Sequence, residues 1–138
     1  MSLPRQVLLI AGLALLPALG TGWKVWPLLD GEPALRPYEV TLEEVAGWPD
    51  PVLWIDARPS EAFQRAHVPG ALSLPESEWE SGLAAVLEAW SPEHRVLVYC
   101  AETACSTSVR VAERLRADLG SENVYYLRGG FEAWQATR

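Results

Sequence analysis

A short apolar run that leads directly into a helical pattern constrains the fold of this chain more than any other feature. Residues 96–99, Val-Leu-Val-Tyr, predict a buried strand that stops at Cys100. Residues 106–119 then carry apolar side chains at the spacing of one helix face, and Gly120 stands where a C-cap glycine is expected. The apolar positions of that face are Val109, Ala112, Leu115 and Leu119. Cys100 is therefore predicted at the carboxyl end of a strand, in a tight loop that faces the start of a helix.

The same alternation of strand and helix patterns runs through the rest of the chain from residue 38. The predicted strands are residues 38–40, 52–55, 71–74, 96–99 and 123–127. Helical patterns begin at Thr41, which forms a capping box with Glu44, at Pro59, at Glu76, at Ser106 and after Gly129. The helix expected at residues 76–90 carries Trp79, Leu83, Val86, Leu87 and Trp90 on one side. Such alternation predicts an α/β fold with a parallel sheet of about five strands.

The predicted position of Cys100 has a chemical consequence. Parallel sheets carry their sites beyond the carboxyl ends of strands, where Asp56, Cys100 and Arg128 fall. The first turn of a helix leaves backbone N–H groups without partners, and a short loop before it adds others to an anion-binding nest. We therefore expect the sulfur of Cys100 to be exposed and ionised near neutral pH, with a pKa below the free value of about 8.5. The alternative is a buried, inert cysteine at a strand end.

Composition and charge narrow the class of protein. A length of 138 residues indicates one domain, and a hydrophobic fraction of 49% with 21% charged residues is enough for a core. The net charge of −7, without a basic run, argues against nucleic acid as a partner. The two cysteines and two histidines show no zinc-type spacing, so no metal site is expected.

Residues 1–29 differ in character from the rest of the chain. Apart from Arg5, residues 1–23 are uncharged and mostly apolar, which is typical of a signal peptide or an uncleaved hydrophobic membrane-anchor helix. The small residues Ala18 and Gly20 have the spacing that suits signal peptidase, whereas Trp23 and Trp26 suit a membrane interface and favour the anchor. Either interpretation predicts export, with the domain anchored and facing the periplasm or the outside, or secreted to the periplasm after cleavage. The remaining divisions are a linker at residues 30–37 and a domain at residues 38–138.

Five short motifs lie in order between about residues 38 and 134. They are Asp56-Ala57-Arg58, Glu61-Ala62-Phe63, His67-Val68-Pro69-Gly70-Ala71, Val98-Tyr99-Cys100, and Leu127-Arg128-Gly129-Gly130-Phe131 with Trp134. One of them alone is a weak signal, but together they resemble the rhodanese-like (sulfurtransferase) domain family. The resemblance implies an α/β fold with a five-stranded parallel sheet and helices on both faces. It also implies that the turn at His67 is structural rather than catalytic.

The resemblance further implies a reaction. Cys100 takes up a sulfane sulfur as a persulfide and passes it to a thiol or another thiophilic acceptor, as a rhodanese-type sulfurtransferase does. The partners are a small sulfur donor and a thiol acceptor, which is a small molecule or a protein, and no cofactor is required. Loop N–H groups then hold the negative charge of the outer sulfur, as an oxyanion hole would. The expected substrate-binding residues are Ala101, Glu102, Thr103, Ala104, Cys105, Ser106 and Arg58.

The loop departs from the family pattern in its charge. It spans six residues up to Cys105, which suits sulfur, whereas phosphatase relatives carry one residue more and end in an arginine where Ser106 stands here. Many relatives that use thiosulfate have arginine at the sixth position, and this chain has Cys105 there and a negative charge at Glu102. We therefore expect thiosulfate, an anion, to be a poor donor. Arg58 or Arg128 supplies positive charge from a neighbouring loop, or serves as a structural ion-pair partner.

Cys105 leaves two alternatives open. It is a small buried residue at the helix start, or it is a resolving thiol that attacks a Cys100 persulfide, releases sulfide and leaves a disulfide. Three classes of function follow: a sulfurtransferase, a thiol–disulfide redox protein that uses both cysteines, and a non-catalytic rhodanese-fold binding module. The cysteine at the first loop position argues against the binding module, since non-catalytic domains often lack it.

Overall fold

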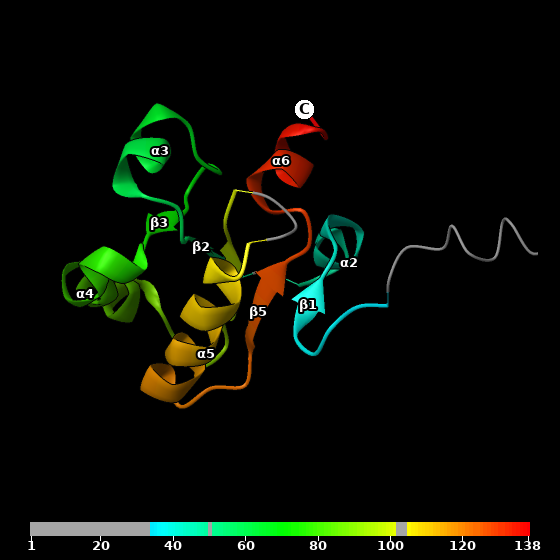
Figure 1. The fold of residues 1–138 in the computed structure, drawn as a ribbon. Helices are drawn as coiled ribbons and strands as arrows, with labels where there is room; N and C mark the ends of the chain where they lie inside the picture. Colours follow the sequence, from blue (N-terminus) through cyan, green and yellow to red (C-terminus); the bar gives the residue numbers. More distant parts are fainter. Residues whose placement is uncertain (1–33, 50, 102–104) are drawn as a thin grey trace, which may run out of the picture. The chain divides into compact units, whose positions relative to one another are not determined.

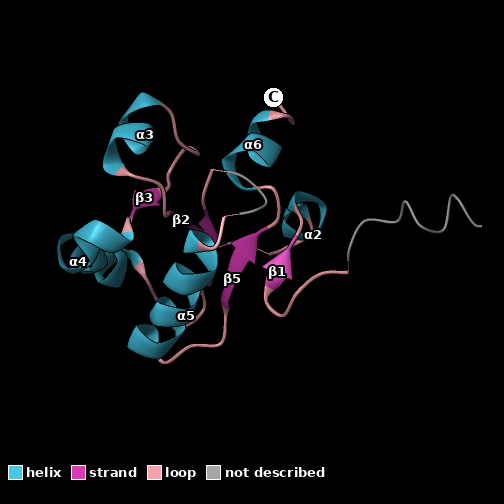
Figure 2. Cartoon of the chain, in the orientation of Figure 1, coloured by secondary structure: helices cyan, strands magenta, loops and turns pink. Residues whose placement is uncertain are grey.

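Five short parallel strands form one sheet (Figures 1 and 2). They are β1 (Glu39–Val40), β2 (Val52–Asp56), β3 (Leu72–Ser73), β4 (Arg95–Tyr99) and β5 (Val124–Leu127). Their order in the sheet is β1-β5-β4-β2-β3, with every neighbouring pair parallel, so that β4 lies in the middle. The computed structural model describes residues 34–49, 51–101 and 105–138. The predicted five-stranded parallel sheet is confirmed.

Both faces of the sheet are covered, which explains why the inner strands read as near-continuous apolar runs. In β4, Val96 and Val98 pack into one hydrophobic cluster. Leu97 and Tyr99 pack into a second cluster on the other face, and all four side chains are fully buried. Both faces of the middle strand are therefore shielded from solvent, and a site on this strand is expected at one of its ends.

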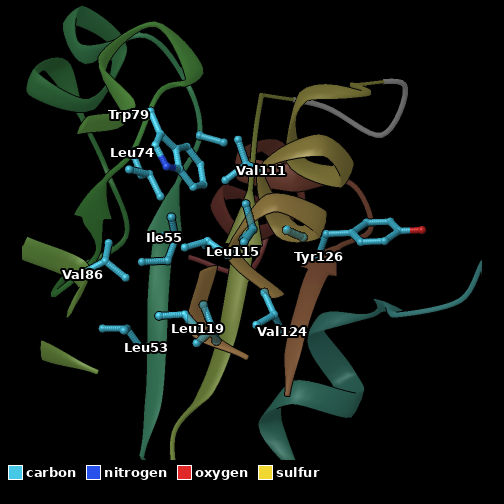
Figure 3. Packing of buried hydrophobic residues seen from close by; sticks show 14 residues of the cluster. Leu53, Ile55, Leu74, Trp79, Val86, Val111, Leu115, Leu119, Val124 and Tyr126 are labelled. Atoms are coloured by element: carbon cyan, nitrogen blue, oxygen red, sulfur yellow. The ribbon is translucent and has the colours of Figure 1, made fainter. Parts of the chain in front are cut away.

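Helices cover the two faces in two groups, as the family resemblance implied. One face carries α4 (Trp79–Ala89), which follows the 3₁₀ turn η1 (Glu76–Glu78), and α5 (Thr107–Leu119). The other face carries α2 (Leu42–Ala46), α3 (Ser60–Arg65) and α6 (Gly130–Gln135). Figure 3 shows the first cluster, in which Val111 and Leu115 of α5 lie against Ile55 of β2.

Two predicted helix ends are confirmed by their local chemistry. The Thr41 hydroxyl accepts a hydrogen bond from the N–H of Glu44 at 3.2 Å, and the Glu44 carboxylate accepts one from the N–H of Thr41 at 2.8 Å. Gly120 ends α5 in the left-handed region, with φ of 60°. These ends follow from residue type alone, because a capping box and a C-cap glycine act within one turn.

The apolar sides of the two longer helices are only partly buried. Leu87 is 49% exposed, because α4 turns Trp79 and Val86 to the core and Leu87 lies about 100° further round the helix. In α5, Val111 is fully buried, whereas Val109 is only partly buried. The helix packs against both β4 and β5, so its apolar stripe is wider than the spacing of one face suggested.

The predicted N-terminal hydrophobic helix of residues 1–29, as signal or anchor, lies outside the described residues, as does most of the predicted linker. Residues 34–38 enter β1 without helix or strand. Of the helices in the described part of the chain, none combines the length and the apolar character needed to cross a membrane.

Candidate active site

Cys100 directly follows β4, and the start of α6 holds its backbone in place. The carbonyl oxygen of Cys100 accepts a hydrogen bond from the N–H of Phe131 at 2.7 Å, and that of Ala101 accepts one from the N–H of Glu132 at 3.2 Å. Gly130 makes this approach possible, because a Cβ there would overlap the carbonyl oxygen of Cys100 and lie 3.0 Å from the carbonyl carbon of Ala101. Its φ of +54° is also a conformation that favours glycine. The double-glycine motif therefore positions the first residues of the loop.

The sulfur of Cys100 is joined to Cys105 in a disulfide. The Cα atoms of the two residues are 6.4 Å apart, within the range of ordinary disulfides. Cys100 is 2% exposed, so the expectation of an exposed thiolate is wrong for this state of the protein. In this state the sulfur of Cys100 is bonded to that of Cys105 and therefore cannot ionise. The structure thus brings together the two cysteines of the resolving-thiol alternative.

A pocket of about 230 Å³ opens over this disulfide at the carboxyl edge of the sheet. Its walls come from the chain after β2, after β3 and after β4, as expected for a parallel sheet. It is lined by Ala57, Arg58, Pro59, Pro75, Glu76, Ser77, Cys100, Ala101, Cys105 and Thr107. Of the expected substrate-binding residues, Ala101, Cys105 and Arg58 line the pocket, and Ser106 lies between two lining residues. Residues 102–104 of the predicted loop lie outside the described residues.

Arg58 lines the pocket, but its charge is paired with Asp56. Nε of Arg58 donates to both carboxylate oxygens of Asp56 at 3.0 and 3.1 Å, and Nη2 donates to Oδ2 at 2.6 Å. Nη2 also donates to the carbonyl of Ala66 at 2.6 Å, and the guanidinium lies 3.8 Å over the ring of Phe131. Burial opposes the charged form, yet the hydrogen bonds that Arg58 donates to the Asp56 carboxylate raise the pKa of Arg58. The guanidinium therefore has a structural role, because its hydrogen bonds connect the carboxyl end of β2 to the turn before β3.

Tyr99 extends this buried network to the His67 turn. Its hydroxyl accepts a hydrogen bond from the N–H of Val68 at 3.1 Å. Burial raises the pKa of Tyr99 well above 10, and the Asp56 carboxylate adds to the shift. His67 itself stacks on Phe63 with ring centres 3.9 Å apart and does not line the pocket, in keeping with the structural role expected for it.

Arg128 lies at the carboxyl end of β5 and bonds the Glu39 carboxylate at 3.0 Å, as the ion-pair alternative expected. It is not among the residues that line the pocket. Within the described ranges, no three His, Cys, Asp or Glu side chains gather in a way that could hold a metal ion.

The sequence analysis did not predict a role at the site for two residues at the rim of the pocket, Glu76 and Arg110. Glu76 lines the pocket from η1, and its carboxylate binds Arg110 of α5, with Nη2 to Oε2 at 2.6 Å and Nε to Oε1 at 3.0 Å. Arg110 also donates to the hydroxyl of Ser106 at 2.8 Å and to that of Thr107 at 3.3 Å. The signal was present, because Glu76 soon follows the end of β3 and Arg110 lies one helical turn beyond Ser106. Only the fold, however, shows that these two segments meet.

The sheet and its loop define an α/β protein with a cysteine site at the carboxyl end of its middle strand. Residues 41–137 match the model of the Rhodanese-like domain family, and the chain belongs to that family. The sequence prediction of a rhodanese-like domain is thereby confirmed.

Solved structures agree with this fold. The BH2092 protein from Bacillus halodurans is 24% identical with a TM-score of 0.58, over 88% of this chain and 82% of that one. The rhodanese-like domain of the Alr3790 protein from Anabaena sp. is 24% identical with a TM-score of 0.51, over 70% and 86%. A rhodanese-like domain protein from Staphylococcus aureus is 22% identical with a TM-score of 0.50, over 70% and 89%. At these identities the likeness concerns the fold.

Proposed function

We propose that this chain is a rhodanese-type sulfurtransferase in which Cys100 carries a sulfane sulfur as a persulfide. The observation that supports this most is the position of Cys100 at the floor of the pocket, at the head of the loop between β4 and α5. A thiolate there lies near the N-terminal end of a 13-residue helix, whose free N–H groups favour negative charge. The N–H groups of residues 101–106 and the wall at Arg58 are the proposed contacts of the bound sulfur.

The proposed transfer is a pair of displacements at sulfur. The thiolate of Cys100 attacks the outer sulfur of a donor R–S–SH; an S–S bond forms, the donor's S–S bond breaks, and RS⁻ leaves with the electron pair. The enzyme then holds Cys100–S–SH. An acceptor thiolate attacks the outer sulfur and releases the Cys100 thiolate, which completes the cycle. No electrons are gained or lost overall, so the proposed cycle needs no redox cofactor.

The disulfide sets a condition on this cycle. Cys100 is a nucleophile only after a thiol reductant has converted the disulfide to two thiols, with two reductant thiols oxidised to their own disulfide. The oxidised form is therefore the inactive form of the proposed enzyme.

The same disulfide favours a second candidate function, a thiol–disulfide redox protein. In this mechanism the thiolate of Cys105 attacks the inner sulfur of the Cys100 persulfide, and the outer sulfur leaves as hydrosulfide. The Cys100–Cys105 bond forms and the persulfide bond breaks. The sulfane sulfur is reduced to sulfide, and the two thiols become the disulfide that the structure contains.

Mass spectrometry of the reduced protein after exposure to sulfur donors tests the first function. We expect an adduct of about 32 Da on Cys100, absent in Cys100→Ser. Sulfur transfer to an acceptor thiol that survives in Cys105→Ser supports the transferase. Loss of turnover in Cys105→Ser, with sulfide release by the unsubstituted chain, supports the redox protein instead. If no donor leaves an adduct on reduced Cys100, the sulfurtransferase proposal is wrong.

The segment of residues 1–29 supports a further part of the proposal, that the domain works outside the cytoplasm as an anchored or secreted protein. An oxidising compartment would favour the disulfide state. Intact-mass measurement of the membrane fraction distinguishes the two forms: a chain that begins at Thr21 contradicts the anchor.

A further inference from the structure

The ion pair between Glu76 and Arg110 lies at the rim of the Cys100 pocket but has no part in the sulfur displacements above. Three hydrogen bonds join the two side chains, at 2.6, 3.0 and 3.2 Å. Glu76 lines the pocket from η1, and Thr107, which Arg110 also contacts, lines it from α5. The pair therefore links two of the segments that line the pocket, η1 and the start of α5.

We propose that the Glu76–Arg110 ion pair sets the charge selectivity of this pocket. By neutralising Arg110, Glu76 excludes dianionic sulfur donors of the thiosulfate type and leaves the pocket to donors of low charge, the organic persulfides. This inference rests on the proposed sulfurtransferase function and names its substrate class.

The charges around the pocket cancel one another. Of the described residues that line it, Arg58 is the cation and Glu76 is the anion. The charge of Arg58 is matched by the fully buried Asp56, and that of Arg110 by Glu76. A dianionic donor therefore meets no uncompensated positive charge in this wall, whereas a donor of low charge needs none.

Arg110 is held at the rim by more than its bond to Glu76. Nη1 donates to the hydroxyl of Ser106, the N-cap residue of α5, at 2.8 Å, and Nη2 donates to that of Thr107, the first residue of α5, at 3.3 Å. The bonds from Arg110 also lower the pKa of Glu76, so that the carboxylate stays ionised at neutral pH. Neutralising Glu76 therefore leaves a guanidinium beside the pocket, still anchored to two hydroxyl groups.

Thiosulfate makes this difference measurable. The Cys100 thiolate would attack its outer sulfur, the bond to the sulfonate sulfur would break, and sulfite would leave with the electron pair and two negative charges. The two negative charges of thiosulfate are shared between the outer sulfur and the sulfonate oxygens, and those of the departing sulfite lie on its sulfur and oxygens, so an unpaired Arg110 acts on binding and on the leaving group.

The test compares Glu76→Gln with Glu80→Gln in the full, reduced chain. Glu80 is a matched control, because it also pairs across to α5, with Arg114 at 3.6 Å, but does not line the pocket. With thiosulfate as donor we expect Glu76→Gln to lower KM roughly fivefold to tenfold. With the persulfide of 2-mercaptoethanol as donor, any change in KM should be several-fold smaller than the change with thiosulfate. Glu80→Gln should match the unsubstituted chain with both donors, and Arg110→Ala should abolish the gain of Glu76→Gln.

A binding measurement separates this inference from the proposed function. In a Cys100→Ser background, calorimetry should show thiosulfate binding roughly fivefold tighter when Glu76→Gln is added, and the gain should shrink as salt is raised. No gain, or an equal gain in Glu80→Gln, overturns the inference. If the unsubstituted chain transfers sulfur from no donor, the sulfurtransferase proposal fails, and the calorimetry still decides the role of Glu76.

Discussion

The N–H of Phe131 donates a 2.7 Å hydrogen bond to the carbonyl oxygen of Cys100, across 31 positions of sequence. This bond joins the beginning of α6 to the residue proposed to carry sulfur. It requires the backbone of Gly130 to pass where no side chain fits, so a helix remote in sequence controls the position of the loop.

The first prediction concerns that close approach. Gly130→Ala should destabilise the protein by about 2–4 kcal/mol, because its Cβ meets the backbone of Cys100 and Ala101 in addition to the cost of a positive φ. Gly120→Ala is the matched control, since Gly120 also has a positive φ but no atom within 4 Å of the added Cβ. It should cost about 1 kcal/mol. Urea unfolding measures both, and equal losses would show that the approach to Cys100 does not matter.

The second prediction concerns the buried ion pair of Asp56 and Arg58. Asp56→Asn should lower the free energy of unfolding by about 3–5 kcal/mol, because it leaves a guanidinium that is 9% exposed without its counter-charge. Glu80→Gln breaks a pair with side chains that are 50% and 91% exposed, and it should cost less than about 1 kcal/mol. Chemical denaturation of the two variants checks this. Similar losses would mean that the Asp56–Arg58 pair is energetically an ordinary surface pair.

The third prediction concerns Tyr99. Tyr99→Phe removes the acceptor of the Val68 N–H and should cost about 1–3 kcal/mol at neutral pH. Because the pKa of Tyr99 is raised above the ordinary value of 10.0 in the folded protein, its contribution is complete below pH 10 and is lost as the pH rises further. The alkaline loss of stability should therefore be smaller in Tyr99→Phe. Unfolding curves between about pH 7 and pH 11.5 test both parts, and an unchanged alkaline slope would contradict the second.

The fourth prediction concerns access to Cys100. Without reductant, iodoacetamide should modify neither cysteine, because both are in the disulfide. In Cys105→Ser, Cys100 should react without prior reduction, and faster than an ordinary thiol because of the nearby helix start. Mass spectrometry of the modified peptide follows the reaction. Rapid alkylation of the unreduced, unsubstituted chain would show that the disulfide is not its resting state, and a rate no faster than that of an ordinary thiol in Cys105→Ser would contradict the helix effect.

Much of the fold could be predicted because its signals are local. The run at residues 96–99 and the capping box at Thr41 each depend on neighbours within a few positions, and both are confirmed. Their order then predicts a parallel sheet, since parallel strands need crossover helices. The place of Cys100 at a strand end follows from the same reasoning.

What the sequence did not predict depends on segments that meet only in the folded chain. The contact between Glu76 and Arg110 joins residues 34 positions apart, and neither lies in a motif. The sequence analysis left the burial of Cys100 and its pairing with Cys105 as alternatives, because a cysteine at a strand end can be exposed, buried or paired. The exposure of Leu87 was not predictable, because the apolar side of α4 is broader than the face that packs against the core.

The bond between Cys100 and Cys105 encloses only a short ring, with a separation of five positions. A ring of that size restricts the unfolded chain little, by about 2 kcal/mol in the chain-entropy treatment. The strands and helices owe their cohesion to the two hydrophobic clusters, and neither cluster includes Cys100 or Cys105. Surrounding redox conditions can therefore change the state of this sulfur while the fold persists, so that an oxidant would stop the proposed sulfur transfer before it lowered the stability of the domain.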